Sequence, residues 1–166
     1  DGIAMKADWR HTTLGEAARI VPGFAFRSKD FGDHGTPVVK ITEIRPPYVQ
    51  LTNAVKVDTG PYDTKRLEKY RLRKGDFLVA MTGATIGKVG RITQETNAYV
   101  NQRVAKFEEI PDISDHGFIY YIVSSNGFTR FIDRTSTGSS VQQNISATDI
   151  GQMEILLPPL PEQKAI

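Results

Sequence analysis

Apolar residues recur at every second position in several short stretches of the chain, a period that is typical of β-strands. Gly, Pro and Asp separate these stretches, and Lys74-Gly75-Asp76 is a turn signal that leads into an apolar run. The pattern predicts a sheet of short strands joined by tight turns. The expected strands cover residues 24–26, 37–44, 77–81, 86–92, 99–107 and 153–157.

Helical periodicity is confined to short segments. Residues 13–20 are expected to form an amphipathic helix, because Thr13 and Glu16 stand in the positions of a capping box and apolar residues recur on one face. Residues 65–70 are expected to add one or two helical turns. The sequence therefore predicts a mixed fold in which strands dominate.

The longest helical candidate covers residues 114–134. Ser114 or Asp115 is the expected N-cap, because both side chains can accept a hydrogen bond from the backbone of the first turn. Gly127 is expected to kink or divide the helix. The polar residues 135–146 that follow predict a loop.

With 166 residues, 39% of them hydrophobic and 24% charged, the chain is about the size of one soluble globular domain. It contains no apolar run of the roughly 18 residues that a spanning helix needs, and its first ten residues lack the apolar core of a secretory signal. The absence of cysteine excludes disulfides and thiolate nucleophiles and fits a reducing cytoplasm. Met5 could be the native start, with residues 1–4 an expression remnant.

Charge is unevenly distributed along the chain. The net charge is only +2, but residues 64–106 hold ten Lys or Arg against three acidic residues, a local charge of +7. This asymmetry indicates a side that faces a polyanion, although a solvated basic helix would give the same count.

The stretch "GDFLVAMTGATIGKVGRI", residues 75–92, invites comparison with a phosphate-binding loop. A P-loop has four residues between its two glycines and a Ser or Thr after its lysine. Here three residues separate Gly83 from Gly87, and Val89 follows Lys88. Glycines that permit a tight turn and close strand packing are the better local explanation.

Other patterns that suggest chemistry are incomplete. "RPPY" at Arg45–Tyr48 resembles the (Asn/Asp/Ser)-Pro-Pro-(Tyr/Phe) motif of DNA amino-methyltransferases, but arginine has only donors and cannot accept the bond from a target amino group. Ser139 and Ser140 have no recognisable base. The histidines lack metal-site spacing, so no metal is expected. They are His11, His34 and His116.

Polar side chains suited to DNA gather on expected loops and strand ends beside the basic segment. Gln and Asn can pair with adenine, Arg with guanine, and Ser, Thr and Lys with phosphate, although ordinary turn chemistry explains the same residues. The set comprises Thr82, Thr85, Lys88, Asn101, Gln102, Arg103, Ser139, Ser140, Gln142, Gln143 and Asn144.

Three motifs in a fixed order make the pattern specific. They are "GDFLVAMTGATIGKVG" at 75–90, "NQRVAKF" at 101–107 and "GSSVQQNISATDIGQMEILLPPLPEQKAI" at 138–166. Together with "LGEAARI" at 14–20, they closely resemble one target recognition domain of the specificity (S) subunit of type I restriction-modification systems. The departure is Gln143, which stands where that family often has proline.

The resemblance implies an α/β (α+β) domain over residues 5–160 with a curved mixed β-sheet and short flanking helices. Residues 161–166, with Pro161 near the first helical position, would begin a coiled-coil spacer helix. The implied role is non-catalytic: a cytoplasmic reader of one half of a bipartite target. The implied partners are double-stranded DNA, modification (M) and restriction (R) subunits, and a second recognition half or a homodimer formed through the spacer helix. S-adenosylmethionine, ATP and Mg are implied only for the partner subunits.

Two groups of residues are expected to contact DNA. Contacts to bases or phosphates are expected at Thr82, Thr85, Lys88, Gln102, Arg103, Ser139, Gln142, Gln143 and Asn144. Base readout is expected from the less family-like segment, at Arg27, Lys29, Lys40, Thr42, Arg45, Tyr48, Gln50 and Asn53. A nucleotide-binding enzyme that uses the turn from Gly83 to Lys88 and a protein-interaction module remain as alternatives.

Overall fold

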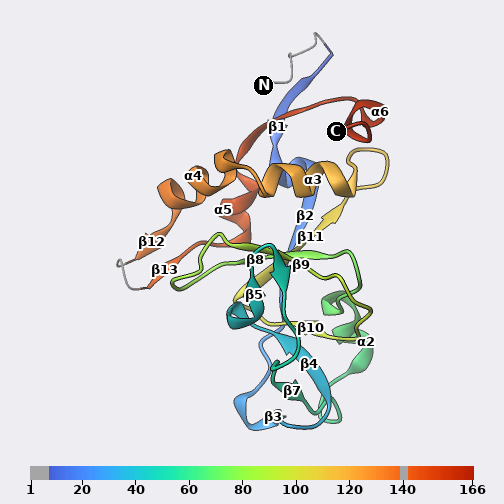
Figure 1. Cartoon of the computed structure of the whole chain (residues 1–166), viewed down its shortest axis with the longest axis vertical. Helices are drawn as coiled ribbons and strands as arrows, with labels where there is room; N and C mark the ends of the chain where they lie inside the picture. The colour runs from blue at the N-terminus through green and yellow to red at the C-terminus, as the bar shows by residue number, and fades with distance from the viewer. Residues whose placement is uncertain (1–7, 139–141) are drawn as a thin grey trace.

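The computed structural model describes residues 8–138 and 142–166. Within these residues the strands form four sheets, and the molecule is long in one direction (Figure 1). Four short helices lie over one face of a six-stranded sheet, and a smaller sheet lies at the opposite end of the molecule. The expected mixed α/β architecture is confirmed.

The six-stranded sheet forms the middle layer. Only the pair β6–β9 is parallel, so the sheet is mixed. Its strands, in spatial order, are β2 (Ala18–Pro22), β11 (Val104–Glu109), β8 (Phe77–Ala80), β9 (Val89–Arg91), β6 (Tyr48–Val49) and β5 (Ile44–Arg45).

Strand β8 is buried on both faces, which explains why its four residues are all apolar. Phe77 and Val79 face the core beneath the helices, whereas Leu78 and Ala80 belong to a second core on the other face of the sheet. The helices on the first face are α1 (Leu14–Ala17), α3 (His116–Val123), α4 (Asn126–Thr135) and α5 (Ala147–Gly151).

The smaller sheet closes the far end of the molecule, and an aromatic cluster around Phe26 and Tyr99 packs against it. Its strands, in spatial order, are β10 (Tyr99–Val100), β4 (Thr36–Val39), β7 (Lys56–Val57) and β3 (Phe31–Gly32). Short helical turns connect this region to the main sheet. They are η1 (Ser28–Asp30), η2 (Ile41–Glu43), α2 (Thr64–Leu67) and η3 (Glu68–Tyr70).

Two small strand pairs complete the fold. Strand β1 (Arg10–Thr13) pairs antiparallel with β14 (Glu154–Leu157), and α6 (Leu160–Gln163) follows directly. The hairpin of β12 (Thr137–Gly138) and β13 (Gln143–Asn144) projects from one side of the molecule (Figure 1).

Several expectations are confirmed. Strands lie within 77–81 and 153–157, residues 64–70 are helical, and a helical turn lies near Pro161. The carboxylate of Asp115 caps α3 by accepting a hydrogen bond from Phe118 N at 3.1 Å.

The expected single strand over residues 99–107 is wrong. A turn at residues 101–103 divides it, because Asn101 N donates to Val39 O and thereby holds β10 in the smaller sheet. The strand expected over 37–44 ends at Val39. The Glu43 carboxylate accepts a hydrogen bond from Lys40 N at 2.7 Å, and this contact closes the helical turn η2.

The helix expected over residues 13–20 is one turn long, and Thr13 forms no side-chain cap. Residues 18–22 instead form β2, because β11 offers them an antiparallel partner. The long helix is divided at Ser125, not at Gly127. Ser125 Oγ accepts from Phe128 N and starts α4 as its N-cap.

One strand expectation and one loop expectation are also wrong. Residues 24–26 form no strand, and Phe24 makes only an isolated bridge to Asn101. The segment 135–146, expected to be a polar loop, contains the paired strands β12 and β13.

Candidate nucleic-acid interface

Two turns of the main sheet and the hairpin meet on one side of the molecule. Gly83 N donates to Gln143 O at 3.1 Å, and Ile145 N donates to Met81 O at 3.0 Å, so the turn between β8 and β9 is hydrogen-bonded to the hairpin. Met81 N donates to Arg103 O at 3.0 Å, which adds the turn between β10 and β11. We call residues 82–88, 102–103 and 142–144 the ledge (Figure 1, left side).

The segment that joins the two sheets lies beside the ledge. A Cβ on Gly83 would come within 3.2 Å of Ile41 Cδ1, so η2 touches the turn after β8. Pro46 and Pro47 line a shallow hollow together with Lys88 and Gln143. Part of the segment that carries the second group of expected contacts therefore lies next to the ledge, which carries most of the first group.

Two cations of the ledge have no internal partner. Lys88 and Arg103 are exposed, and their side chains form no hydrogen bond, ion pair or ring contact with any other described residue. Within residues 8–138 and 142–166, the Arg45 guanidinium makes only a 3.2 Å hydrogen bond to Thr42 O. These charges are therefore available to an external anion.

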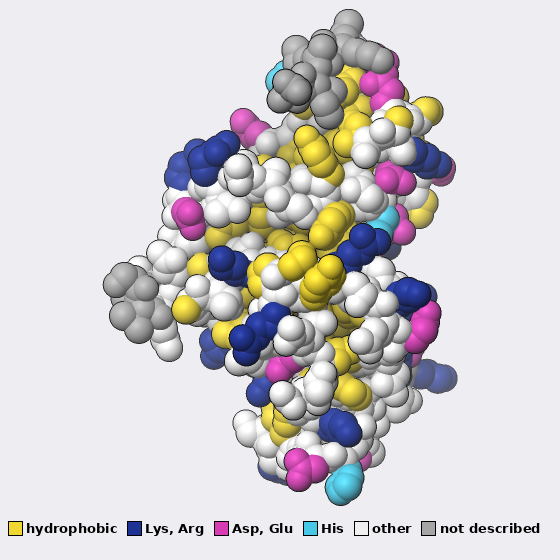
Figure 2. All heavy atoms as spheres, in the orientation of Figure 1, with side chains coloured by type: hydrophobic (Ala, Val, Ile, Leu, Met, Phe, Trp, Pro, Cys, Tyr) yellow, Lys and Arg dark blue, Asp and Glu magenta, His cyan; other side chains and the backbone are white. Residues whose placement is uncertain are grey.

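The basic segment 64–106 does not form one patch. Lys106 is buried, donates to Arg71 O at 3.1 Å and pairs with Glu108 at 3.0 Å. Helix α2, which carries Lys65 and Arg66, lies on the side of the molecule opposite the ledge (Figure 1). Figure 2 shows Lys and Arg side chains dispersed over the visible face, with apolar side chains gathered in its middle.

Four amides of the glycine-containing turn after β8 are bonded within the protein and do not face a phosphate. The N–H groups of residues 83, 86, 87 and 88 donate to backbone carbonyls of Gln143, Gly83, Ala80 and Thr85, at 2.8–3.2 Å. Gly87 has a φ of +79°, and a Cβ there would lie 2.8 Å from Ile132 Cγ2. The glycines of this motif serve the turn and its packing.

The two threonines of the ledge are turned inward. Thr82 is 7% exposed, and its hydroxyl lies 2.6 Å from Asn144 Oδ1 and 3.1 Å from Gln143 O. Thr85 Oγ1 is buried and has no hydrogen-bond partner among the described residues. Thr82 joins the turn to the hairpin; DNA contact by either threonine stays a prediction.

The remaining candidates are spread over the molecule. Gln102, Gln142 and Asn144 are exposed on the ledge, and Gln143 is half-buried there. Tyr48 is 53% exposed. Lys40 lies over the Phe31 ring at 5.8 Å. Thr42 and Gln50 are exposed near the ends of β5 and β6, Lys29 and Asn53 are exposed beside the smaller sheet, and Ser139 and Ser140 lie outside the described residues.

Arg27 lies in a separate cluster with Asp30 and Tyr62. Its Nε donates to Asp30 Oδ2 at 2.9 Å, and its guanidinium lies 5.2 Å from the centre of the Tyr62 ring. Tyr62 and Asp30 raise the pKa of Arg27, and the hydrogen bonds from Tyr62 and Arg27 lower the pKa of Asp30. The Arg27 side chain is nevertheless 50% exposed, and base contact by Arg27 stays a prediction.

Arg91 was not among the expected contacts. It lies over the Tyr120 ring at 5.3 Å and lines a second hollow with Tyr48 and Lys74. The alternation of β9 places Arg91 at an exposed position, but the partner ring on α3 has no sequence signal.

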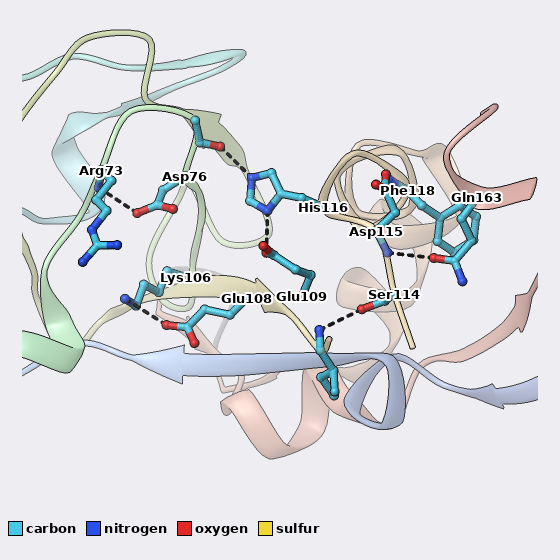
Figure 3. A network of polar contacts seen from close by, with 12 residues as sticks. Arg73, Asp76, Lys106, Glu108, Glu109, Ser114, Asp115, His116, Phe118 and Gln163 are labelled. Atoms are coloured by element: carbon cyan, nitrogen blue, oxygen red, sulfur yellow. Dashed lines mark hydrogen bonds and ion pairs between the residues drawn. The ribbon is translucent and has the colours of Figure 1, made fainter. Parts of the chain in front are cut away.

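A polar network lies at the start of α3 (Figure 3). The Asp76 carboxylate accepts from Arg73 N at 2.8 Å, and burial raises the pKa of Asp76. His116 bridges Glu109 Oε2 at 3.0 Å and Gly75 O at 2.8 Å. These contacts tie α3 to the turn that leads into β8.

Neither a metal centre nor a membrane span is present in the described part of the chain. No group of three or more His, Asp or Glu side chains there is placed to hold a metal ion. No helix there is long and apolar enough to cross a bilayer.

Comparison with known proteins identifies the family of the chain. The family model of the type I restriction modification DNA specificity domain matches residues 6–166. The chain belongs to this family. This type I specificity domain is 28% identical, over 170 residues, to the type I restriction enzyme EcoBI specificity subunit of Escherichia coli. The match covers 99% of the chain and 32% of that subunit.

Solved structures share the fold of this specificity domain. The HsdS subunit from Thermoanaerobacter tengcongensis superposes with a TM-score of 0.69 at 17% identity, over 99% of this chain and 36% of that one. The S subunit from M. genitalium gives 0.63 at 16% identity, over 98% and 38%. A chain of a type I R-M system gives 0.68 at 17%, over 99% and 37%. The specificity domain spans about a third of the length of these relatives.

Proposed function

We propose that this specificity domain binds double-stranded DNA along the ledge and reads one half of a bipartite target. The observation that carries the proposal is the pair of cations, Lys88 and Arg103, that have no partner within the described residues and stand beside exposed amide side chains. Cations neutralise phosphates, and amides can pair with adenine in the major groove. The ledge combines both kinds of contact on one side of the molecule.

Positioning and base reading are assigned to different parts of this side. Lys88 and Arg103, on turns of the shared motifs, would bind phosphates and fix the register on the duplex. Arg45, Tyr48 and Gln50, on the less family-like segment beside the ledge, would contact base edges. This division lets related domains keep one docking geometry while they read different sequences.

The domain contributes recognition and no catalysis in this proposal. Methyl transfer with S-adenosylmethionine belongs to the modification subunits, and ATP- and Mg-dependent translocation and cleavage belong to the restriction subunits. The domain would position both on DNA, paired with a second recognition half through a spacer helix that continues α6. A single half reads few base pairs, so its own affinity depends strongly on phosphate contacts and on salt.

A salt titration of two matched double variants tests the proposal. Lys88→Ala with Arg103→Ala removes two cations from the ledge, and Lys65→Ala with Arg66→Ala removes two from the opposite side. Binding to a cognate duplex would be followed by fluorescence anisotropy from about 50 to 200 mM salt. Each lost phosphate contact should reduce the slope of log K against log salt by about 0.9, so the ledge variant should lose about 1.8.

The control double variant should keep most of the wild-type slope, because its cations lie away from the ledge. Equal losses from both variants would show that the effect comes from net charge and not from the ledge. An unchanged slope in the ledge variant would contradict the proposed interface.

A further inference from the structure

Helix α6 is held against the start of α3 by one buried side chain, that of Gln163. Gln163 is 1% exposed, although glutamine is a polar residue that usually lies at the surface. A buried amide is costly unless its polar atoms find partners. The contacts of Gln163 therefore indicate what the residue does.

The Gln163 amide forms three hydrogen bonds to two separate parts of the chain, residues 113–115 and Pro158. Its Oε1 accepts from Asp115 N at 2.9 Å, and its Nε2 donates to Ile113 O and to Pro158 O, both at 2.9 Å. Both amide hydrogens are used, and all three partners are backbone groups. Figure 3 shows the side chain of Gln163 pointing at Asp115.

The segment bound by Gln163 is itself fixed to the main sheet. Ser114 Oγ accepts from Ile110 N at 3.0 Å, which closes the connection between β11 and α3. His116, one residue after Asp115, contacts Gly75 O and Glu109 Oε2. A short series of hydrogen bonds thus links α6 to the turn that enters β8, the strand that ends at the ledge.

A second contact holds α6 from the other side. Trp9 Nε1, just before β1, donates to Glu162 Oε2 at 2.8 Å. Gln163 and Glu162 are adjacent, so α6 is bound both to the start of α3 and to the strand pair β1–β14.

We propose that Gln163 is a positioning residue whose side-chain amide fixes the direction of α6 relative to α3 and the six-stranded sheet. The direction of α6 relative to α3 does not depend on DNA binding. Its consequence rests on the proposed function: where a spacer helix continues α6, Gln163 sets the angle between that helix and the ledge.

Distance measurements by pulsed electron spin resonance test whether Gln163 fixes α6 relative to α3. The sequence contains no cysteine, so Ser124→Cys and Ala165→Cys, both at exposed positions, provide two unique label sites, one at the C-cap of α3 and one just after α6. The parent chain should give one narrow distance distribution. Gln163→Leu keeps the side-chain volume but leaves three backbone groups unpaired, and should broaden the distribution about twofold.

The matched control is Gln152→Leu, which makes the same chemical change at an exposed position. It should leave the distribution narrow. A Gln163→Leu variant that is folded by circular dichroism and gives the parent distribution overturns the inference. If that variant does not fold, hydrogen exchange of the unmodified chain decides: slow exchange of the Asp115 amide supports the bond to Gln163, and exchange at the rate of an exposed amide overturns it.

The consequence is measured separately, in a specificity subunit assembled with modification subunits. Gln163→Leu should relax discrimination against targets whose gap is one base pair longer or shorter, and unchanged discrimination overturns the link to the spacer angle. Absence of DNA binding by the parent assembly would contradict the proposed function alone, because the distance distribution still decides whether Gln163 positions α6.

Discussion

Replacement of Gly87 by alanine tests whether the glycine-containing motif after β8 serves folding. Gly87 has a φ of +79°, and its missing Cβ would lie 2.8 Å from Ile132 Cγ2 and 3.2 Å from Ile132 Cβ. Ile132 is 1% exposed and belongs to the core beneath the helices. The new methyl group would therefore meet a side chain that has little room to move.

Two terms set the expected loss of stability. A left-handed conformation costs an L-residue about 1–2 kcal/mol, and forcing a methyl group into a packed core costs about 1–3 kcal/mol. The free energy of unfolding should fall by about 2–5 kcal/mol in Gly87→Ala. Gly75 isolates the first term, because its φ is +94° and no heavy atom lies within 4 Å of its missing Cβ. Gly75→Ala should cost only about 1–2 kcal/mol.

Equilibrium unfolding in urea would compare the two variants at constant m-value. Gly87→Ala should be the less stable, and the excess should shrink when Gly87→Ala is combined with Ile132→Ala in a double-mutant cycle. Equal losses from Gly87→Ala and Gly75→Ala would refute the packing argument. Tight binding of a nucleoside triphosphate, abolished by Gly87→Ala, would restore the phosphate-loop alternative.

Two further predictions concern buried polar groups. Thr82→Val should lower the free energy of unfolding by about 1 kcal/mol, because the Thr82 hydroxyl contacts Asn144 and Gln143. The control Thr93→Val, at an exposed site, should change the free energy of unfolding little. Equal effects of the two substitutions in urea unfolding would contradict the contacts of Thr82. Burial raises the pKa of Asp76, so between a pH of about 3.8 and that raised pKa the folded state keeps a proton that the unfolded state releases. The parent chain should therefore lose stability as the pH rises through this window, and Asp76→Asn should not show that loss. Unfolding curves measured across pH should diverge in that sense, with Asp76→Asn the more stable variant above the window, and parallel curves would contradict the burial of Asp76.

The sequence predicted those helices and strands that depend on residues close together in the chain. The run of apolar residues in β8 between two turns, and the Asp115 cap before α3, are both visible in the sequence and both present in the structure. The division of residues 99–107 was not predictable in this way. The turn carries no Gly or Pro, and the partner of Asn101 N is Val39 O, which lies in another sheet.

For the candidate site, residue type predicts which side chains suit DNA but not which of them are exposed. Lys88 and Arg103 have the residue type expected of a phosphate contact, and both lie exposed on the ledge. Thr82 also has a suitable residue type but is buried, because the hairpin that covers it pairs with it across 61 positions of sequence. The +7 of residues 64–106 described composition correctly but not a surface, since the fold buries Lys106 and places α2 on the side opposite the ledge.

The central claim is that this domain reads one half of a bipartite DNA target through the ledge and the segment beside it. The most direct measurement is the genomic methylation pattern produced by a type I system that carries the domain, compared with the pattern after substitution of Arg45, Tyr48 and Gln50. The account predicts a bipartite motif with a fixed gap, in which the substitutions change or abolish one half and leave the other half intact. A motif without two halves, or one that the substitutions leave unchanged, would contradict it.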